Sequence, residues 1–379
     1  MSEIEPGTAV ETAEALAEQA AAGRTIELGG NFSKRSYGGP IASADAVIST
    51  RKLDQVLAYE PADLTLGVEA GMPWAQLEAL LAENGQLLPL DPPFAENATV
   101  GGVVACNCSG PQRRRYGTAR DLVIGMEFAT LEGKLVQSGG MVVKNVTGLD
   151  MAKLMIGSLG TLAAMTRVNF KIFPRPEGRR TFLFRSTDVQ KLIDLRHALL
   201  RSQTSPFALD LAPETDAFVL AAEAGGSRAL LDRYTGDYKD QALRSGVDLE
   251  IPEDGELFWK TLRGFQSRAQ EQSRCVVRAA CTATRLRELP PLLGSAEDWL
   301  LRAANGVLYA AAETDKTAEL LESLRGAGFS ALLEQAPEEA KASLEAWAAP
   351  GSDFQAMQRL KKTFDPKGLL NPGRFFSKL

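Results

Sequence analysis

Short apolar runs and amphipathic stretches alternate along the first 90 residues, a pattern that predicts alternating strands and helices. One amphipathic stretch is rich in Ala, Leu and Glu and ends at Gly23, which is a common helix terminator. Another begins at Pro73, which fits the first turn of a helix. The predicted helices lie at 13–22 and 73–84, and the predicted strands at 25–28, 56–59 and 64–68.

Between Pro89 and Gly117 the chain is rich in Gly, Pro, Asn and Ser and carries only the short apolar piece 100–106. Most backbone groups in this stretch must be satisfied by something other than long ladders, and a bound ligand is one candidate. Pro174-Arg175-Pro176 then suggests a domain boundary. Further elements are predicted as a hairpin over 121–137, an extended run at 162–173, strands at 181–185, 207–211, 274–280 and 306–312, and a helix at 189–200.

The chain has 379 residues and a formal net charge of -6. This length suggests two domains, and the acidic balance disfavours nucleic acid as a partner because phosphate binding needs a basic face. No run reaches the roughly 18 apolar residues of a membrane span, and the polar N-terminus is unlike a secretory signal. We therefore expect a cytoplasmic protein. The four cysteines are too few and too scattered for a disulfide framework, so reduced thiols are expected.

Glycine-bearing motifs carry the chemistry. GGNFSKRSYGG at 29–39 follows a predicted strand, and its successive N–H groups can form a nest for a diphosphate. Alone this motif is weak, because it matches neither the Rossmann nor the P-loop fingerprint. Small residues recur in 89–93, 98–102 and 109–117, and they permit close backbone approach. Such an array suits a large flat cofactor.

At these motifs the chain resembles the vanillyl-alcohol oxidase family with its PCMH-type FAD-binding domain. The resemblance is carried by GGNFSKRSYG, by ATVGGVVACNCSGPQRRRYG, by KNVTGLDMAKLMIGSLGTL and by the closing FDPKGLLNPGRF, in that order. It implies an α+β fold: a two-lobed FAD-binding domain over 1–176, a cap of antiparallel sheet and helices over 177–335, and a segment 336–379 that returns to the first domain. The cofactor implied is FAD, bound non-covalently.

The resemblance also assigns cofactor-binding positions. They are Gly29, Gly30, Asn31, Phe32, Ser33, Lys34, Pro89, Thr99, Val100, Gly101, Gly102, Ser109, Gly110, Tyr116, Gly117, Gly157, Gly160, Thr161 and Leu162. In the closing signature, Asn371 and Arg374 are the catalytic candidates, since a guanidinium can grip a substrate carboxylate bidentately. The alternative for Arg374 is a solvated residue on a docked tail.

Within that family the wording of the motifs is most similar to the FAD-binding subunits of bacterial glycolate oxidases. This implies a small 2-hydroxy-acid substrate, a homologous larger flavin subunit and an iron–sulfur subunit as partners, and at most peripheral association with the inner membrane through them. Two alternatives stay open: a self-sufficient FAD-dependent D-lactate or alditol dehydrogenase or oxidase, and a non-catalytic assembly subunit that retains the fold.

Oxidation of a 2-hydroxy acid needs a base for the hydroxyl proton, and histidine is the commonest choice. The single histidine, His197, falls within a predicted helix and is expected to be solvated. Tyr116, Lys144 and Glu127 are substitutes that the sequence does not rank. One imidazole also cannot supply a multi-histidine metal site, so no metal is expected. We therefore expect this chain to relay electrons, with the substrate chemistry in a partner subunit.

A non-covalent flavin is released when the protein is precipitated with acid. Purified protein is expected to show flavin absorbance bands, and acid precipitation is expected to leave the yellow colour in the supernatant, as measured by its absorbance spectrum. Colour that stays with the pellet would contradict non-covalent binding.

Overall fold

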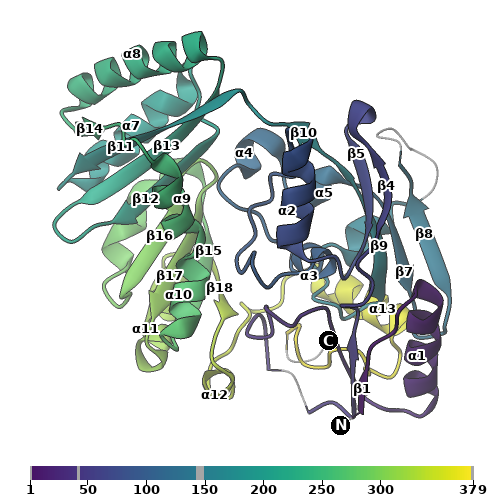
Figure 1. The fold of residues 1–379 in the computed structure, drawn as a ribbon. Coiled ribbons are helices and arrows are strands. Elements are labelled where there is room, and N and C mark those ends of the chain that lie inside the picture. The colour runs from purple at the N-terminus through teal and green to yellow at the C-terminus, as the bar shows by residue number, and fades with distance from the viewer. Residues whose placement is uncertain (1, 41–42, 142–148, 377–379) are drawn as a thin grey trace. The chain divides into compact units, whose positions relative to one another are not determined.

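The computed structural model describes residues 2–40, 43–141 and 149–376, which fold into two compact units. The first unit comprises Met1–Ser109, Tyr116–Pro174 and Glu345–Leu379, and the second comprises Gly110–Arg115 and Arg175–Leu344. Figure 1 labels the helices and strands. Each unit is described below by itself.

A small parallel sheet begins the first unit, with the order β1 (Ser2–Ile4), β3 (Ala46–Ser49), β2 (Ile26–Gly29). Helix α1 (Ala9–Ala21) begins at Thr8, whose hydroxyl accepts a hydrogen bond from the N–H of Glu11 at 3.1 Å. Leu16 of this helix packs with Ile26, Ile48 and Leu370 in a small core. The parallel strand β2 therefore ends at the glycine motif with one face buried.

A five-stranded antiparallel sheet forms the larger part of the first unit, with the order β4-β5-β9-β7-β8. These strands are β4 (Val56–Glu60), β5 (Thr65–Glu69), β9 (Ala164–Lys171), β7 (Val123–Ala129) and β8 (Leu135–Gly139), and β6 (Gln86–Leu87) pairs separately with β10 (Phe173–Pro174). Helix α2 (Trp74–Glu83) buries Trp74, Leu77 and Leu81 in the same core as β5 and β9. The other helices of this unit are η1 (Pro61–Asp63), α3 (Val100–Ala105), α5 (Ala119–Leu122), α6 (Ala152–Met155) and α13 (Phe354–Phe364). Helix α4 (Arg113–Tyr116) begins in residues of the second unit and ends at Tyr116 of the first.

The second unit is built on one eight-stranded antiparallel sheet with the order β14-β11-β13-β12-β16-β17-β15-β18. Its strands are β11 (Gly178–Ser186), β12 (Ala208–Pro213), β13 (Phe218–Gly226), β14 (Asp248–Glu250), β15 (Cys275–Ala280), β16 (Asp298–Arg302), β17 (Val307–Ala312) and β18 (Ser330–Gln335). Its helices are α7 (Val189–Arg201), α8 (Arg228–Ser245), α9 (Gly255–Arg263), α10 (Phe265–Glu271), η2 (Ala283–Glu288), η3 (Pro290–Leu292), α11 (Thr314–Gly326) and α12 (Glu338–Lys341).

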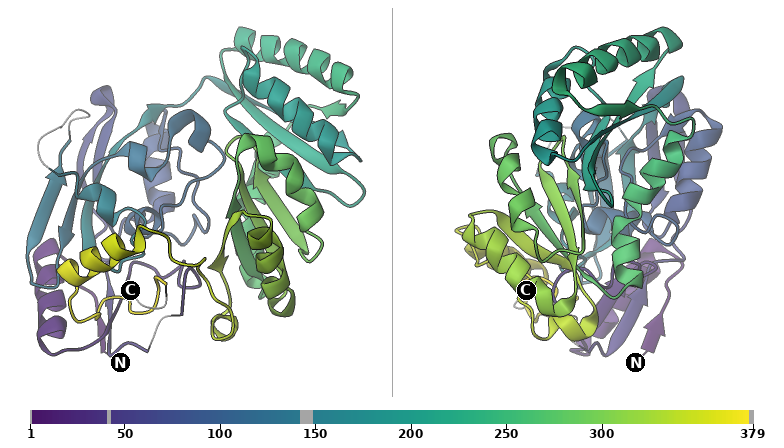
Figure 2. Two further views of the ribbon diagram at one scale, coloured as in Figure 1. Left: turned by 180° about the vertical axis from the view of Figure 1, so that it is seen from behind. Right: turned by 90° about the vertical axis from the view of Figure 1, so that its left-hand side faces the viewer.

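Helices cover both faces of this sheet. Tyr238 of α8 packs against Phe182 of β11 with ring centroids 4.8 Å apart. Trp259 of α9 donates its indole N–H to Thr181, the neighbouring residue of the same strand, at 3.1 Å. Successive residues of a strand point to opposite faces, so α8 and α9 lie on opposite sides of the sheet, as the two views of Figure 2 let the reader follow.

A row of charged side chains lies on the face of the sheet that α9 covers. Leu183 and Asp210 both pair with Ala221, so their side chains point to the same face. We call this row the charged stripe; it consists of Arg179, Glu223, Asp210, Arg302, Arg278 and Glu334. Each arginine of the stripe is paired with a carboxylate: Arg179 with Glu223 at 3.2 Å, Arg278 with Glu334 at 3.0 Å, and Arg302 with Asp210. Burial raises the pKa of Glu334, and Arg278 opposes that rise. The stripe is therefore neutralised within the unit.

The observed elements follow the hydrophobic pattern closely in the first unit, where α1, α2, β4, β5, β7 and β8 overlap the predicted segments. The apolar piece 100–106, which the sequence left unassigned, forms α3, and Thr99 accepts a bond from the N–H of Gly102 at 3.3 Å at its start. In the second unit, β11, α7, β12, β15 and β17 overlap predicted elements, whereas β13, β16 and β18 were not predicted.

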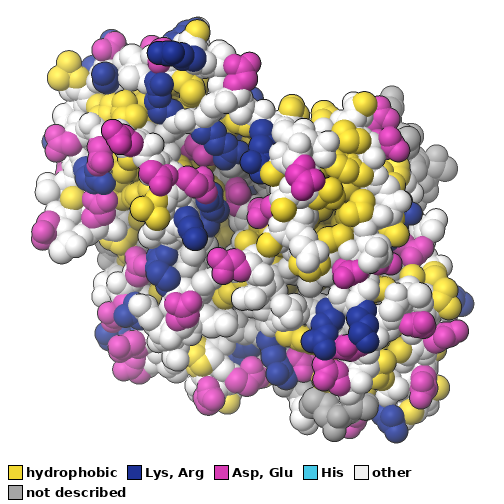
Figure 3. All heavy atoms as spheres, viewed as in Figure 1, with side chains coloured by type: hydrophobic (Ala, Val, Ile, Leu, Met, Phe, Trp, Pro, Cys, Tyr) yellow, Lys and Arg dark blue, Asp and Glu magenta, His cyan; other side chains and the backbone are white. Residues whose placement is uncertain are grey.

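Two surface properties bear on the sequence predictions. Among the described residues, no helix is both long and apolar enough to cross a membrane. Acidic and basic side chains are interspersed over the face shown in Figure 3. The mixed charge on that face agrees with the modest net charge of -6.

The buried pair of Arg302 and Asp210 provides a stability prediction for the second unit. Both side chains are almost fully buried, so Arg302→Met would leave the Asp210 carboxylate in the interior without its arginine. We expect the free energy of unfolding to fall by about 3–5 kcal/mol, measured by denaturant titration. Arg287→Met removes an exposed pair with Asp194 and should cost far less. Equal losses in the two variants would contradict this account.

Candidate cofactor site

A cavity lies in the first unit. Three loops and the C-terminal segment form its walls. The lining residues are Leu28, Gly29, Gly30, Asn31, Phe32, Ser33, Lys34, Arg35, Thr50, Thr99, Gly101, Gly102, Ala105, Cys106, Leu159, Gly160, Ala163, Ala164, Met165 and Arg374. The glycine motifs near positions 30, 101 and 160, far apart in sequence, thus line one cavity.

The loop after β2 presents a run of backbone amides without protein partners. The N–H groups of residues 30–34 donate no hydrogen bond within the described part of the chain. The carbonyl of Gly29 accepts from the N–H of Thr50 at 2.9 Å, and that of Gly30 from the hydroxyl of Ser49 at 2.8 Å. In a trans peptide group the C=O and N–H point in opposite directions. These carbonyl bonds therefore turn the next two N–H groups away from β3.

Gly30 and Lys34 are buried, whereas Asn31 is exposed and Phe32 and Ser33 are half-buried. Buried N–H groups are almost always paired in native structures, so this amide run is suited to a partner from outside the chain. Successive N–H groups of this kind form a concave site for an anion. A diphosphate fits this donor set, because its oxygens can accept several such bonds at once.

Glycine is required where two walls of the cavity meet. A Cβ on Gly30 would lie 2.2 Å from the hydroxyl oxygen of Thr99, the residue before α3. Gly160 has φ +70°, in the left-handed region, and a Cβ there would lie 2.7 Å from the amide nitrogen of Asn371. Side chains at either position would push the walls apart.

Three cationic side chains line the cavity, and two of them are held by protein groups. Arg35 pairs with Glu27 at 2.7 Å, and its side chain is 59% exposed. Arg374 donates to backbone carbonyls. Lys34 is only 5% exposed, its ammonium lies 3.5 Å from the hydroxyl of Ser33 and 5.9 Å from the ring centroid of Phe94, and no carboxylate is paired with it in the described chain. Lys34 is therefore the cation most suited to an anionic ligand.

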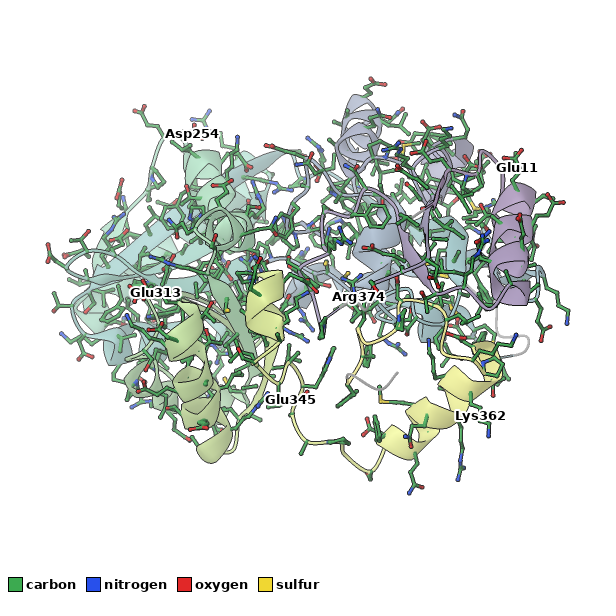
Figure 4. The ribbon with its side chains drawn as sticks, turned by 90° about the horizontal axis from the view of Figure 1, so that it is seen from below. Glu11, Asp254, Glu313, Glu345, Lys362 and Arg374 are labelled. Carbon is green, nitrogen blue, oxygen red and sulfur yellow. The ribbon has the colours of Figure 1, made fainter. Side chains whose placement is uncertain are left out.

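We call residues 345–376 the tail; it runs from Glu345 through α13 to the last described residue. Figure 4 shows Arg374 on the loop that follows α13, and Lys362 on α13 itself. The Arg374 side chain is buried and donates to the carbonyls of Lys34, Arg35 and Tyr37 at 2.7, 3.2 and 3.0 Å. The tail therefore supports the amide-bearing loop from behind.

Asn371 joins two cavity loops. Its side chain is fully buried and donates to the carbonyls of Leu28, Leu159 and Gly160 at 3.1, 3.0 and 3.2 Å. Its amide oxygen accepts from the N–H of Leu28 at 2.8 Å. A planar amide supplies donors and an acceptor together. Here its nitrogen donates to backbone carbonyls and its oxygen accepts from a backbone N–H.

Lys361 of α13 supports the third loop. Its ammonium donates to the carbonyls of Thr161 and Leu370 at 2.8 and 3.0 Å and pairs with Asp365 at 2.7 Å. Burial lowers the pKa of Lys361, and Asp365 opposes that shift. The carboxylate of Asp365 also accepts from the N–H groups of Leu369 and Leu370, so one buried ion pair fixes the whole turn.

The predicted cofactor-binding positions divide into two groups. Eleven residues that the sequence singled out line the cavity, Arg374 among them: Gly29, Gly30, Asn31, Phe32, Ser33, Lys34, Thr99, Gly101, Gly102, Gly160 and Arg374. The others do not line it: Pro89, Val100, Ser109, Gly110, Tyr116, Gly117, Gly157, Thr161, Leu162 and Asn371. Gly110 belongs to the second unit. Their roles stay predictions, as do the catalytic roles of Asn371 and Arg374. The side chains of both residues donate to backbone carbonyls.

Sequence reasoning missed several lining residues. The missed residues are Leu28, Arg35, Thr50, Ala105, Cys106, Leu159, Ala163, Ala164 and Met165. The pair Ser49-Thr50 carries a signal in hindsight, because two hydroxyl residues end a buried strand beside the glycine motif. Cys106 is half-buried and lines the cavity, whereas Cys108 is buried.

Among the described residues, none of the candidate bases lines the cavity. Glu127 accepts from Thr166 and Gln137, both at 2.9 Å. His197 is half-buried on α7 of the second unit, where burial lowers its pKa. Tyr116 packs on Phe173 with ring centroids 4.8 Å apart. Lys144 lies outside the described residues. Among the described residues no group of three or more metal-binding side chains occurs.

A two-lobed first unit, a cavity walled by glycine loops and a run of unpaired amides define an FAD-binding flavoprotein of the PCMH type. Solved structures support this fold: p-cresol methylhydroxylase with substrate bound (TM-score 0.77, 15% identity, 99% of this chain and 88% of that chain) and 4-ethylphenol oxidase from Gulosibacter chungangensis (TM-score 0.75, 14% identity, 99% and 89%). At these identities the likeness shows the fold, and the predicted α+β class is confirmed.

Sequence comparisons then give the family. Residues 3–139 match an FAD binding domain, and residues 308–375 match the C-terminal domain of FAD linked oxidases. The glycolate oxidase subunit GlcE of Escherichia coli K12 is 30% identical over 92% of both chains. The chain belongs to this family of FAD-linked oxidases, binds FAD and is an FAD-dependent oxidoreductase, as its motifs predicted.

Other relatives in the family differ in their named activities. The glycolate oxidase subunit GlcD of Bacillus subtilis 168 is 24% identical over 88% of this chain and 79% of its own length. D-2-hydroxyglutarate dehydrogenase of Xanthomonas citri pv. viticola is 26% identical over 90% and 82%. The family therefore includes enzymes named for more than one hydroxy acid.

The cation without a carboxylate partner provides a test of the cofactor site. Lys34→Gln removes the buried charge and should weaken FAD binding roughly tenfold, because bonds between charged groups are the stronger ones. The measurement is titration of apo-protein with FAD, followed by flavin fluorescence. Lys52→Gln, a change at an exposed lysine paired with Glu5, serves as the control and should leave the affinity unchanged. If both variants bind FAD with equal affinity, Lys34 is not part of the FAD site.

Proposed function

We propose that this chain is the FAD-binding subunit of a glycolate oxidase (glycolate dehydrogenase) complex, and that it relays electrons rather than oxidising the substrate alone. The similarity to the E. coli subunit over 92% of both chains carries this proposal. The complex oxidises glycolate or a related 2-hydroxy acid to the 2-oxo acid. FAD supplies the redox chemistry in this chain.

The residues of the chain support a relay role. A hydroxy acid loses a hydroxyl proton when it is oxidised, so its enzyme needs a base near the flavin. The one histidine is on α7 of the second unit, and Glu127 accepts from two neighbours. The arginines of the charged stripe are matched by carboxylates, so they are poorly disposed to grip a substrate carboxylate as well.

The proposed partners are a homologous larger flavin subunit and an iron–sulfur subunit. The similarity to GlcD of B. subtilis supports a homologous flavin partner, since one fold can serve both subunits. The proposed location is the cytoplasm, with peripheral association at the inner membrane through the partners. In the relay, the loops of the first unit hold the cofactor by backbone amides and exclude water from its diphosphate.

A self-sufficient dehydrogenase is the second possible function. The similarity to D-2-hydroxyglutarate dehydrogenase favours it, and Arg374 lines the cavity. A non-catalytic assembly subunit is disfavoured by the intact amide run and the buried Lys34, which have no structural use without an anion.

Mixing the isolated, FAD-loaded chain with substrate separates these functions. Under anaerobic conditions, glycolate or D-lactate should leave the flavin absorbance unchanged, because none of the candidate bases His197, Tyr116 and Glu127 in the described part of the chain lines the cavity. Dithionite should bleach the same sample, which shows that the flavin is present and reducible. Prompt bleaching by either hydroxy acid would overturn the relay role, and a colourless protein that takes up no FAD would support the assembly role.

A further inference from the structure

We propose that the tail is a positioning element of the FAD site, and that tail docking and FAD binding are linked, so that each stabilises the other. This inference rests on FAD binding alone and holds whichever substrate the complex oxidises.

The tail serves the cavity loops through three buried side chains. Lys361 donates to Thr161, Asn371 to Leu28, Leu159 and Gly160, and Arg374 to Lys34, Arg35 and Tyr37. In total, seven carbonyls of the cavity loops accept hydrogen bonds from the tail: one from Lys361, three from Asn371 and three from Arg374. Lys361 also donates to Asp365 and Leu370 of the tail itself.

Satisfying a carbonyl from behind fixes the direction of its peptide group. The carbonyl of Thr161 accepts from Lys361, so the N–H of Leu162 points the opposite way. Without the tail, these carbonyls would lose the bonds from its side chains, and that of Lys34 would keep a second donor, the N–H of Tyr37 at 3.1 Å. A buried unpaired polar group is costly, and amides of the same loops are one set of donors that can replace the tail. Undocking of the tail therefore favours loop conformations in which amides bond to protein carbonyls instead of the cofactor.

Part of the tail is also held outside the cavity: the N–H of Ile26 donates to the carbonyl of Leu369 at 2.8 Å, the N–H of Asn371 donates to the carbonyl of Ile26 at 2.9 Å, and Leu370 packs in the small core. Helix α13 itself adds little burial. Along α13 only Lys361 is buried, while the apolar residues Phe354, Met357 and Leu360 remain half-exposed. Phe364 packs against the core of the first unit. At the other end, Trp347 stacks on Phe375 with centroids 4.5 Å apart and donates to the carbonyl of Arg374 at 3.2 Å.

A substantial part of what holds the tail is therefore its bonds to loops that line the FAD cavity. A ligand that binds only the docked state stabilises that state, and by linkage the docked tail raises the affinity for the ligand by the same factor. The coupling is reciprocal, so it is measurable from either side.

The test uses the full chain in apo and FAD-loaded form. FAD affinity is measured by titration, and tail docking by hydrogen exchange of peptides covering 354–376. In the wild type, saturating FAD should slow exchange of the tail peptides. Arg374→Ala should lower FAD affinity by about tenfold or more, which corresponds to about 1.4 kcal/mol. Arg374→Lys should recover part of the loss, because an ammonium has three donors for the same three carbonyls.

Two further variants separate positioning from general stability. Trp347→Phe keeps an aromatic ring but loses the bond to the carbonyl of Arg374, and Trp347 does not line the cavity. We expect it to weaken FAD binding a few-fold and to speed tail exchange. Arg196→Ala is the matched control: Arg196 is a buried arginine of the second unit that donates to the carbonyl of Ala303 at 2.7 Å. It should lower thermal stability and leave FAD affinity unchanged.

The proposal fails if tail exchange is the same with and without FAD, or if the Arg374→Ala and Trp347→Phe variants both bind FAD as tightly as the wild type. If Arg374→Ala does not fold, Trp347→Phe and Arg374→Lys decide the matter by the same two measurements. A loss of FAD affinity in Arg196→Ala equal to that in Trp347→Phe would also overturn it, because general destabilisation would then explain both.

Discussion

The amides that face the cavity depend on carbonyls that are satisfied on the other side. A peptide group has one donor and one acceptor that point in opposite directions. For residues 30 and 31 to turn their N–H groups to an anion, the carbonyls of Gly29 and Gly30 must find donors elsewhere, and Thr50 and Ser49 at the end of β3 supply them. The parallel pairing of β2 with β3 is thus a requirement of the cofactor site as well as of the core.

The same constraint explains which site residues the sequence could predict. Glycines that must approach another wall, such as Gly30 and Gly160, stand out in a sequence because no other residue fits them. The donors that support them do not. Ser49, Asn371 and Lys361 are ordinary polar residues whose partners lie far along the chain, Asn371 being 343 residues from Leu28. Arg374 was expected to face a substrate carboxylate because guanidinium groups often do; the structure shows it donating to three backbone carbonyls, and its role toward substrate stays a prediction.

Strand prediction failed in the second unit for a related reason. β13 carries the alanine-rich sequence FVLAAEAGG and is buried along most of its length, so it has neither an alternating pattern nor the branched residues typical of strands. Its identity depends on pairing with β11 over nine residues and with β12 on its other side. β11, by contrast, was predicted because Thr181-Phe182-Leu183-Phe184 is rich in aromatic and branched residues. Local pattern locates strands that local chemistry favours, and tertiary pairing decides the rest.

The charged side chains of the stripe in the second unit and Lys34 in the first differ in whether they are paired with an opposite charge, and this difference bears on the roles of the two units. In the second unit every arginine of the charged stripe meets a carboxylate, which offsets the cost of burying each charge. In the first unit Lys34 is buried without a carboxylate, beside amides that also lack partners. Burying an unpaired cation is unfavourable unless an anion joins it. The first unit therefore keeps a buried cation and a run of amides available for an anionic ligand, whereas the charges of the stripe in the second unit are matched among themselves.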